Sequence, residues 1–86
     1  MSDSSFPTSA QLLAAVVSAV KAAGGKASNQ QIQEIVIKDL SLTPDQVAVI
    51  HSGNRTELEY RLAWARTNAK KKGLIASAGP RTWVIP

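Results

Sequence analysis

Residues 55–85, RTELEYRLAWARTNAKKKGLIASAGPRTWVI, decide the fold of this chain of 86 residues. The stretch opens with a helical pattern over about residues 57–72, which a glycine then ends. Two short runs with strand composition follow, residues 74–76 and 82–85, and the SAGPR segment between them is typical of a tight turn. The pattern therefore predicts a long helix followed by a C-terminal β-hairpin.

Most of the positive charge lies in the same stretch. Before residue 55 the chain has three Lys or Arg against four Asp or Glu, a net charge of −1. From residue 55 on it has seven against two, a net charge of +5, and the two parts add to the +4 of the whole chain. A basic helix followed by a hairpin with a basic tip is typical of proteins that bind nucleic acid.

The helix starts share one signature, in which Ser or Thr is followed three residues later by Gln or Glu. This is the capping box of a helix N-terminus. The pairs are Thr8 with Gln11, Ser28 with Gln31, Thr43 with Gln46, and Thr56 with Glu59. Because the signature occurs four times, each time before a stretch with helical spacing, it predicts four helices.

The first two predicted helices span about residues 9–23 and 29–40, and two glycines and a brief strand at residues 26–27 separate them. A short third helix begins at Pro44, because the fixed φ of proline suits the first helical position. Residues 51–54 are expected to form a turn. The order predicts a winged helix-turn-helix, mainly α with a small β-hairpin, in one domain of residues 9–86 after a disordered tail of residues 1–8.

Several function classes are disfavoured by what the sequence lacks. It has no cysteine, no signal-peptide pattern and no apolar run approaching the roughly 20 residues that span a bilayer. It also lacks a metal-ligand cluster, a usefully spaced pair of carboxylates and a glycine-rich phosphate loop. We therefore expect a protein that is not an enzyme, has no cofactor, small-molecule substrate or membrane partner, and is cytoplasmic and associated with the nucleoid.

The outward face of the last helix carries the side chains that we expect to contact double-stranded DNA. Leu58, Leu62, Ala65 and Ala69 share the core side, which leaves the opposite side for the major groove. We assign DNA contacts to Arg55, Thr56, Tyr60, Arg61, Trp64, Thr67, Lys70, Lys71 and, at the hairpin tip, Arg81. Arginine binds phosphate or reads guanine, lysine neutralises phosphates, and hydroxyl groups donate to phosphate oxygens or touch base edges.

Further phosphate contacts are expected from Lys26, Ser28, Asn29 and Lys72. Ser28 and Asn29 stand at a predicted helix N-terminus, where main-chain N–H groups attract anions. Lys26 stands beside them, and Lys72 ends the lysine run.

Each candidate also has a purely structural interpretation. Lysines near a helix C-terminus complement the helix dipole, and Arg61 stands four residues after Glu57, the spacing of an ordinary helical ion pair. A tryptophan such as Trp64 more often packs than stacks on bases, and Trp83 in its strand is expected to pack. His51 is expected to be a solvated turn residue. The arrangement as a whole therefore carries more weight than any one member.

Three motifs connect the chain with a known family. RLAWAR at residues 61–66, KKKGLI at 70–75 and RTWVI at 81–85, with LTP at 42–44 and SG at 52–53, resemble the N-terminal winged-helix domain of Mrr-type restriction endonucleases. The resemblance covers about residues 11–85. Tyr60, where members often have Asn, and Lys72, where a small residue is usual, depart from the family pattern.

This resemblance implies a DNA-binding module that positions a separate nuclease domain on its target. The contact residues that it implies are Arg61, Trp64, Arg66, Lys70, Lys71 and Arg81. The nuclease domain itself is absent from the chain, so we expect either a stand-alone relative or an excised domain. Restriction, phage defence and transcription regulation all stay open as its biological role.

Two alternatives belong to other function classes. A winged helix can be a protein-interaction module, and the alanines of the first helix, Ala14, Ala15, Ala19, Ala22 and Ala23, predict a smooth surface for close packing in a homodimer. RNA binding ranks third, because the sequence does not predict the exposed aromatic pairs that stack single-stranded bases.

Overall fold

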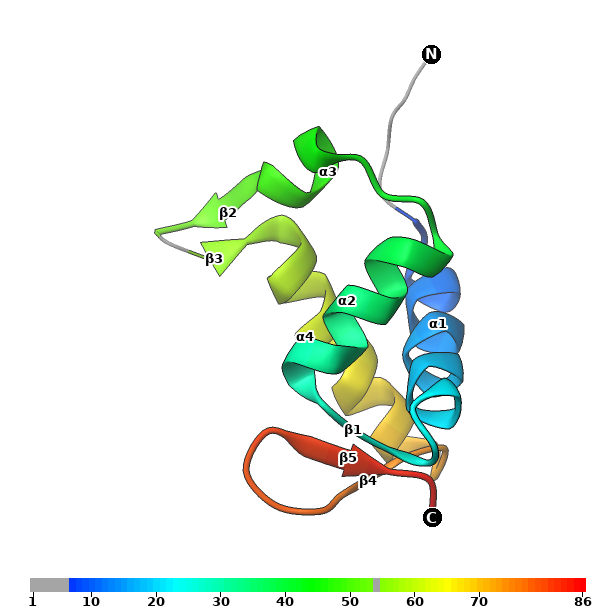
Figure 1. Cartoon of the computed structure of the whole chain (residues 1–86). Helices are drawn as coiled ribbons and strands as arrows, with labels where there is room; N and C mark the ends of the chain where they lie inside the picture. Colours follow the sequence, from blue (N-terminus) through cyan, green and yellow to red (C-terminus); the bar gives the residue numbers. More distant parts are fainter. Residues whose placement is uncertain (1–6, 54) are drawn as a thin grey trace.

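The computed structural model describes residues 7–53 and 55–86. Residues 1–6 of the predicted tail and Asn54 of the predicted turn lie outside the described residues. The elements follow the order α1 (Ser9–Ala22), β1 (Lys26–Ser28), α2 (Asn29–Asp39), α3 (Pro44–Ala48), β2 (Ile50–Ser52), β3 (Arg55–Thr56), α4 (Glu57–Lys71), β4 (Ala76–Ser77) and β5 (Thr82–Val84) (Figure 1). This order confirms the mainly α winged-helix prediction.

All four predicted capping boxes form at the starts of the helices. In each one the hydroxyl accepts a hydrogen bond from the main-chain N–H three residues later, and the Gln or Glu side chain accepts one in return. The eight donor–acceptor distances lie between 2.8 and 3.2 Å. Thr8, at the edge of the predicted tail, is the N-cap of α1.

The ends of the long helices share a second device, in which the residue after the cap takes a left-handed conformation. At α4 this residue is Gly73, with φ 76°, and it donates to the carbonyl of Lys70 while Leu74 donates to that of Ala69. The same pair of hydrogen bonds closes α2, but there the left-handed residue is Ser41, with φ 53°. These are Schellman motifs, which usually have glycine at this position.

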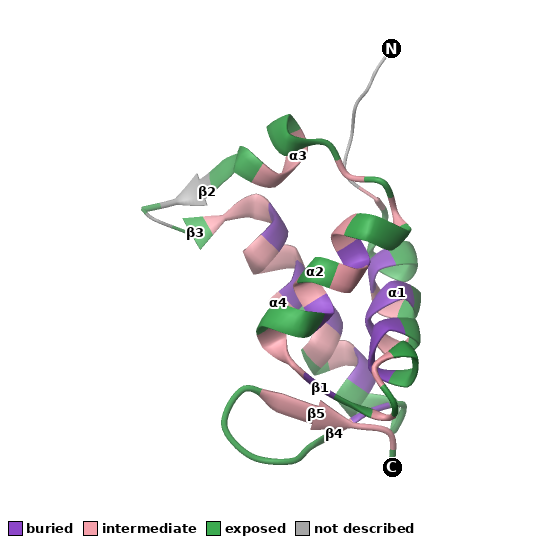
Figure 2. Cartoon of the chain, in the orientation of Figure 1, coloured by how far each residue is buried: buried purple, intermediate pink, exposed green. Residues whose placement is uncertain are grey.

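The core lies where α1, α2 and α4 face one another, with β1 and the start of the wing closing its end (Figure 2). The side chains of α4 predicted to face inward are all buried. The buried hydrophobic residues are Leu12, Ala15, Val16, Ala19, Val20, Ala27, Ile32, Val36, Leu58, Leu62, Ala65, Ala69 and Ile75. Packing of three amphipathic faces into this core fixes the position of α4 relative to α2 and to the wing.

The wing is larger than the predicted hairpin, because β1 joins it. The strands form an antiparallel sheet in the order β1–β5–β4, with Ala27 opposite Trp83 and Ser77 opposite Trp83 on the other side. The strand predicted at residues 74–76 begins later, at Ala76. The reason is that Leu74 still serves the helix cap and Ile75 is buried in the core.

A second, two-stranded antiparallel sheet replaces the simple turn predicted at residues 51–54. Strands β2 and β3 pair around Gly53, whose φ of 56° suits a tight reversal. The main-chain N–H of Glu57 donates to the carbonyl of Val49 at 2.8 Å, which joins this ribbon to the start of α4. Together with α3 it forms an insertion between α2 and α4.

Candidate nucleic-acid interface

The side of α4 turned away from the core carries a row of side chains that we call the outward stripe: Tyr60, Trp64, Thr67 and Lys71. Their spacing of three or four residues places them on one face of the helix. Trp64, Thr67 and Lys71 are exposed, and Tyr60 is partly exposed. The structure therefore brings four of the predicted DNA contacts into one line.

The exposure of Trp64 argues against the alternative interpretation, in which this tryptophan packs inside the domain. Its side chain is 53% exposed. One turn away, the guanidinium of Arg55 lies 5.8 Å from the ring centroid of Tyr60, within the range of a cation–π contact. A hollow of about 190 Å³ lies among Arg55, Tyr60, Ala63, Trp64 and Thr67. The partly exposed Tyr60 and the exposed Trp64 therefore line one hollow on the outward side of α4.

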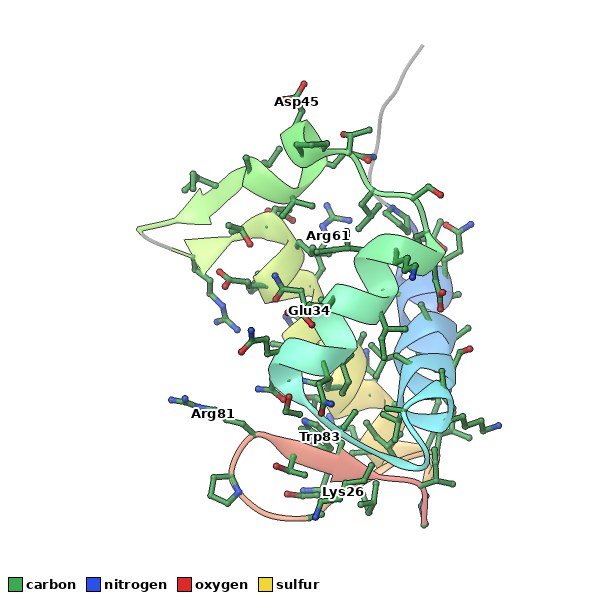
Figure 3. All side chains as sticks on the ribbon, viewed as in Figure 1. Lys26, Glu34, Asp45, Arg61, Arg81 and Trp83 are labelled. Carbon is green, nitrogen blue, oxygen red and sulfur yellow. The ribbon has the colours of Figure 1, made fainter. Side chains whose placement is uncertain are left out.

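Arg61 makes the helical ion pair that its spacing predicts. Its Nε lies 2.6 Å from Oε2 of Glu57, and the two side chains are 41% and 19% exposed. Figure 3 places Arg61 toward the α3 end of the molecule and Arg81 at the opposite end, on the wing. Arg61 therefore lies apart from Arg81, and a carboxylate is already beside it.

A polar groove of about 910 Å³ lies on the other flank of α4, between this helix and α2. We call it the α2–α4 groove. Its lining residues are Asn29, Gln30, Gln33, Glu34, Gly53, Arg55, Glu59 and Arg66. It joins the start of α2, the β2–β3 reversal and the middle of α4, which are far apart in the sequence.

Arg66 is a charge whose surroundings disfavour its protonated form. It is partly buried, and desolvation, followed by the positive charge of Arg55, lowers the pKa of its guanidinium. Lys70 stands one turn further along the same flank and is exposed. Within the described ranges, neither Arg55 nor Arg66 has a carboxylate at ion-pair distance.

The wing tip presents Arg81 in a left-handed conformation, with φ 54°. Its side chain is exposed and extends away from α1 (Figure 3). The wing is tied to α2 by two hydrogen bonds: Asn29 N donates to the Arg81 carbonyl at 2.9 Å, and Trp83 Nε1 donates to Asn29 Oδ1 at 2.7 Å. These bonds and the contact of Trp83 with the core confirm that Trp83 packs.

The main-chain donors predicted to clamp a phosphate at the start of α2 have internal partners instead. The N–H of Asn29 is bound to the wing, and the N–H groups of Ser28 and Gln31 are used by the capping box. Lys26 stands opposite Val84, at the end of β5 away from the tip. The structure therefore separates these candidates from the outward stripe, with Asn29 alone lining the α2–α4 groove.

The remaining predicted residues lie at the two ends of α4 and on α1. Thr56 is occupied as the N-cap of α4, where its hydroxyl accepts from Glu59 N at 3.1 Å. Lys72, the C-cap residue, is exposed on the flank of Arg61, away from the groove. In α1, Ala15 and Ala19 belong to the domain's own core, whereas Ala14 and Ala22 are exposed.

Residues 7–53 and 55–86 contain no group of three or more His, Cys, Asp and Glu side chains placed to hold a metal ion. Over the same residues, every helix is too short or too polar to cross a membrane.

Comparison with protein families shows to which family the chain belongs. The family model of the Mrr N-terminal domain matches residues 10–86. The chain belongs to the Mrr N-terminal domain family. Comparisons with curated proteins and with solved structures give no significant match. The match confirms the resemblance seen in the RLAWAR, KKKGLI and RTWVI motifs, and it spans the helices, the insertion and the wing of this Mrr N-terminal domain.

Helix spacing alone does not indicate the α2–α4 groove of this Mrr N-terminal domain. Gln30, Gln33 and Glu34 carry no motif, and only the fold brings them opposite Arg66. One signal for Arg66 does exist in the sequence. The residues four before and four after it are Leu62 and Lys70, so its own helix offers it no carboxylate at the i,i+4 spacing.

Proposed function

We propose that this Mrr N-terminal domain is a non-enzymatic module that binds double-stranded DNA. The outward stripe of α4 enters the major groove, and the wing contacts the backbone or the minor groove. The proposal rests on a set of cations that lie on α4, on strand β3 directly before it, and at the tip of the wing. Within the described residues, none of them has an acidic partner. They are Arg55, Arg66, Lys70, Lys71 and Arg81.

Unpaired cations favour a polyanionic partner for a physical reason. A solvated lysine that releases condensed counterions on binding contributes affinity, whereas one already paired with a carboxylate first has to break that pair. Arg61, the paired arginine, therefore contributes less than the residues above. The partly exposed Tyr60 presents a hydroxyl group between the cations, suited to phosphate oxygens or base edges. The exposed Thr67 donates its hydroxyl proton to the Ala63 carbonyl at 3.0 Å, which leaves its oxygen as an acceptor for a base edge.

A pair of double variants tests this assignment. Lys70→Gln with Lys71→Gln removes two charges from the last turn of α4, and Lys21→Gln with Lys38→Gln removes the same charge from the last turns of α1 and α2. Both changes lose comparable dipole interactions. We expect the first to weaken duplex binding roughly tenfold and reduce the salt slope by about two, and the second to leave both nearly unchanged.

Binding is measured by fluorescence anisotropy with one labelled duplex. If both double variants lost the same affinity for the duplex, net charge alone would explain the loss, and the assignment of the binding face to α4 would be contradicted. An unchanged affinity in the α4 variant would contradict it as well.

A protein-interaction module is the second candidate, and exposed apolar side chains favour it. Val49, Ile50 and Trp64 are 44%, 59% and 53% exposed, and aromatic residues flanked by arginine are common at protein interfaces. Self-association, through these residues or through α1, is measured by sedimentation velocity over a dilution series. Dimer formation in a chain that does not bind DNA at low salt would favour this candidate over the first.

A further inference from the structure

The α2–α4 groove holds two cations that the free domain leaves uncompensated. Arg55 reaches it from β3 and Arg66 from the middle of α4. Partial burial removes water from Arg66, and the charge of Arg55 acts on it as a second unfavourable influence. An arginine guanidinium stays protonated in proteins, so both charges persist.

Charges that lose hydration are normally paired, because an unpaired buried charge is costly. The two carboxylates of the groove are not at ion-pair distance from either guanidinium, and both accept other hydrogen bonds. Glu59 Oε1 accepts from Thr56 N at 2.9 Å, and Glu34 Oε2 accepts from Gln30 Nε2 at 3.3 Å. Among the described residues, the arginine pair therefore has no counter-ion.

The shape of the groove limits what this counter-ion can be. The groove is concave and open, and beside the arginines it offers the amide side chains of Gln30 and Gln33. Asn29, which also lines the groove, is bonded to the wing at Arg81 and Trp83. A concave surface cannot enter a DNA groove, but it fits the convex ridge of a sugar–phosphate strand.

We propose that the α2–α4 groove binds a phosphodiester group of the DNA backbone, held between Arg55 and Arg66. Two guanidinium groups present forked donors to the phosphate oxygens, and the amide of Gln30 or Gln33 adds a neutral donor. This inference rests on the proposed DNA binding and gives Arg66 a specific ligand. One strand then passes along the groove toward the wing while α4 faces the bases.

Arg66→Gln and Arg61→Gln are a matched pair for the test, because both remove one arginine from α4. In chloride buffer we expect Arg66→Gln to melt a few degrees above the wild type, since it removes an unpaired, partly buried charge. Replacing chloride by inorganic phosphate at equal ionic strength should raise the melting temperature of the wild type and of Arg61→Gln more than that of Arg66→Gln. The part of the rise common to all three chains comes from the exclusion of phosphate from protein surfaces.

The duplex measurement identifies the source of the phosphate. Arg66→Gln should weaken duplex binding roughly tenfold and reduce the salt slope by about one, and Arg61→Gln should change either much less. A phosphate-dependent shift that Arg66→Gln retains in full overturns the site. A shift lost in Arg66→Gln with an unchanged duplex slope overturns the DNA backbone as the source and indicates a free phosphorylated molecule.

The two melting series also separate this inference from the proposed function. If the wild type does not bind duplex DNA at low salt, the DNA proposal fails, and the phosphate series alone decides whether the groove is an anion site. If phosphate then raises the melting temperature of the wild type no more than that of Arg66→Gln, the groove is not an anion site.

Discussion

At the residue scale, the two tryptophans show how identical side chains acquire different roles. Trp83 lies in the central strand of the wing, contacts the core and donates its indole N–H to Asn29. Trp64 lies on the outward stripe of α4 and is 53% exposed. The first holds the wing on α2, and the second leaves its ring at the surface.

Phenylalanine substitutions should separate these roles. Trp83→Phe removes a partly buried hydrogen bond and leaves the Asn29 amide without its donor, so we expect a loss of about 1 kcal/mol in the free energy of unfolding. Trp64→Phe should change it by less than about 0.5 kcal/mol. Urea unfolding followed by circular dichroism measures both, and a larger loss for Trp64→Phe would contradict the packing described above.

Arginines on α4 give a second contrast at this scale. Glu57 stands one turn before Arg61 and pairs with it, which the sequence predicts directly. Arg66 has Leu62 and Lys70 at the same spacings, so the sequence indicates that it is unpaired on its own helix. Its partial burial, and its nearness to Arg55 and Gln33, depend on how α2 and the insertion pack, which helix spacing does not encode.

At the element scale, helix starts are the part of the fold that the sequence predicts best. A capping box is a contact between residues three apart, so its formation depends on a few neighbouring side chains and is readable locally. The beginning of β4 is different, because Leu74 and Ile75 have strand composition but are used by the α4 cap and by the core. The sequence does not indicate the β2–β3 pairing for a similar reason, since turn composition does not reveal whether the flanking residues pair.

Ser41 gives a test of the helix ends. It adopts the left-handed conformation that Gly73 adopts at the end of α4, but it carries a Cβ. Ser41→Gly should raise the free energy of unfolding by about 1 kcal/mol, because glycine takes this conformation without steric strain. Gly73→Ser is the reverse control and should lower it by a similar amount. Urea unfolding compares them, and a Ser41→Gly variant less stable than the wild type would contradict the Schellman motif at α2.

At the scale of the whole molecule, the winged-helix order and the family could both be predicted from the sequence. The charge asymmetry between the two parts of the chain also points to the side of α4 and the wing. The α2–α4 groove could not be predicted, because its lining residues come from α2, the β2–β3 reversal and α4, which are far apart in the sequence. The hydrogen bond from Trp83 to Asn29 could not be predicted either, since residues 29 and 83 are distant in the chain.

The central claim is that unpaired cations on α4, on β3 and on the wing bind the DNA backbone. The most direct test is fluorescence anisotropy of the wild-type chain on a mixed-sequence duplex of about 20 base pairs across a salt series. The account predicts binding whose log–log salt slope lies between about −3 and −6, because several phosphates are neutralised together. Absence of binding at low salt, or a slope near zero, would contradict it.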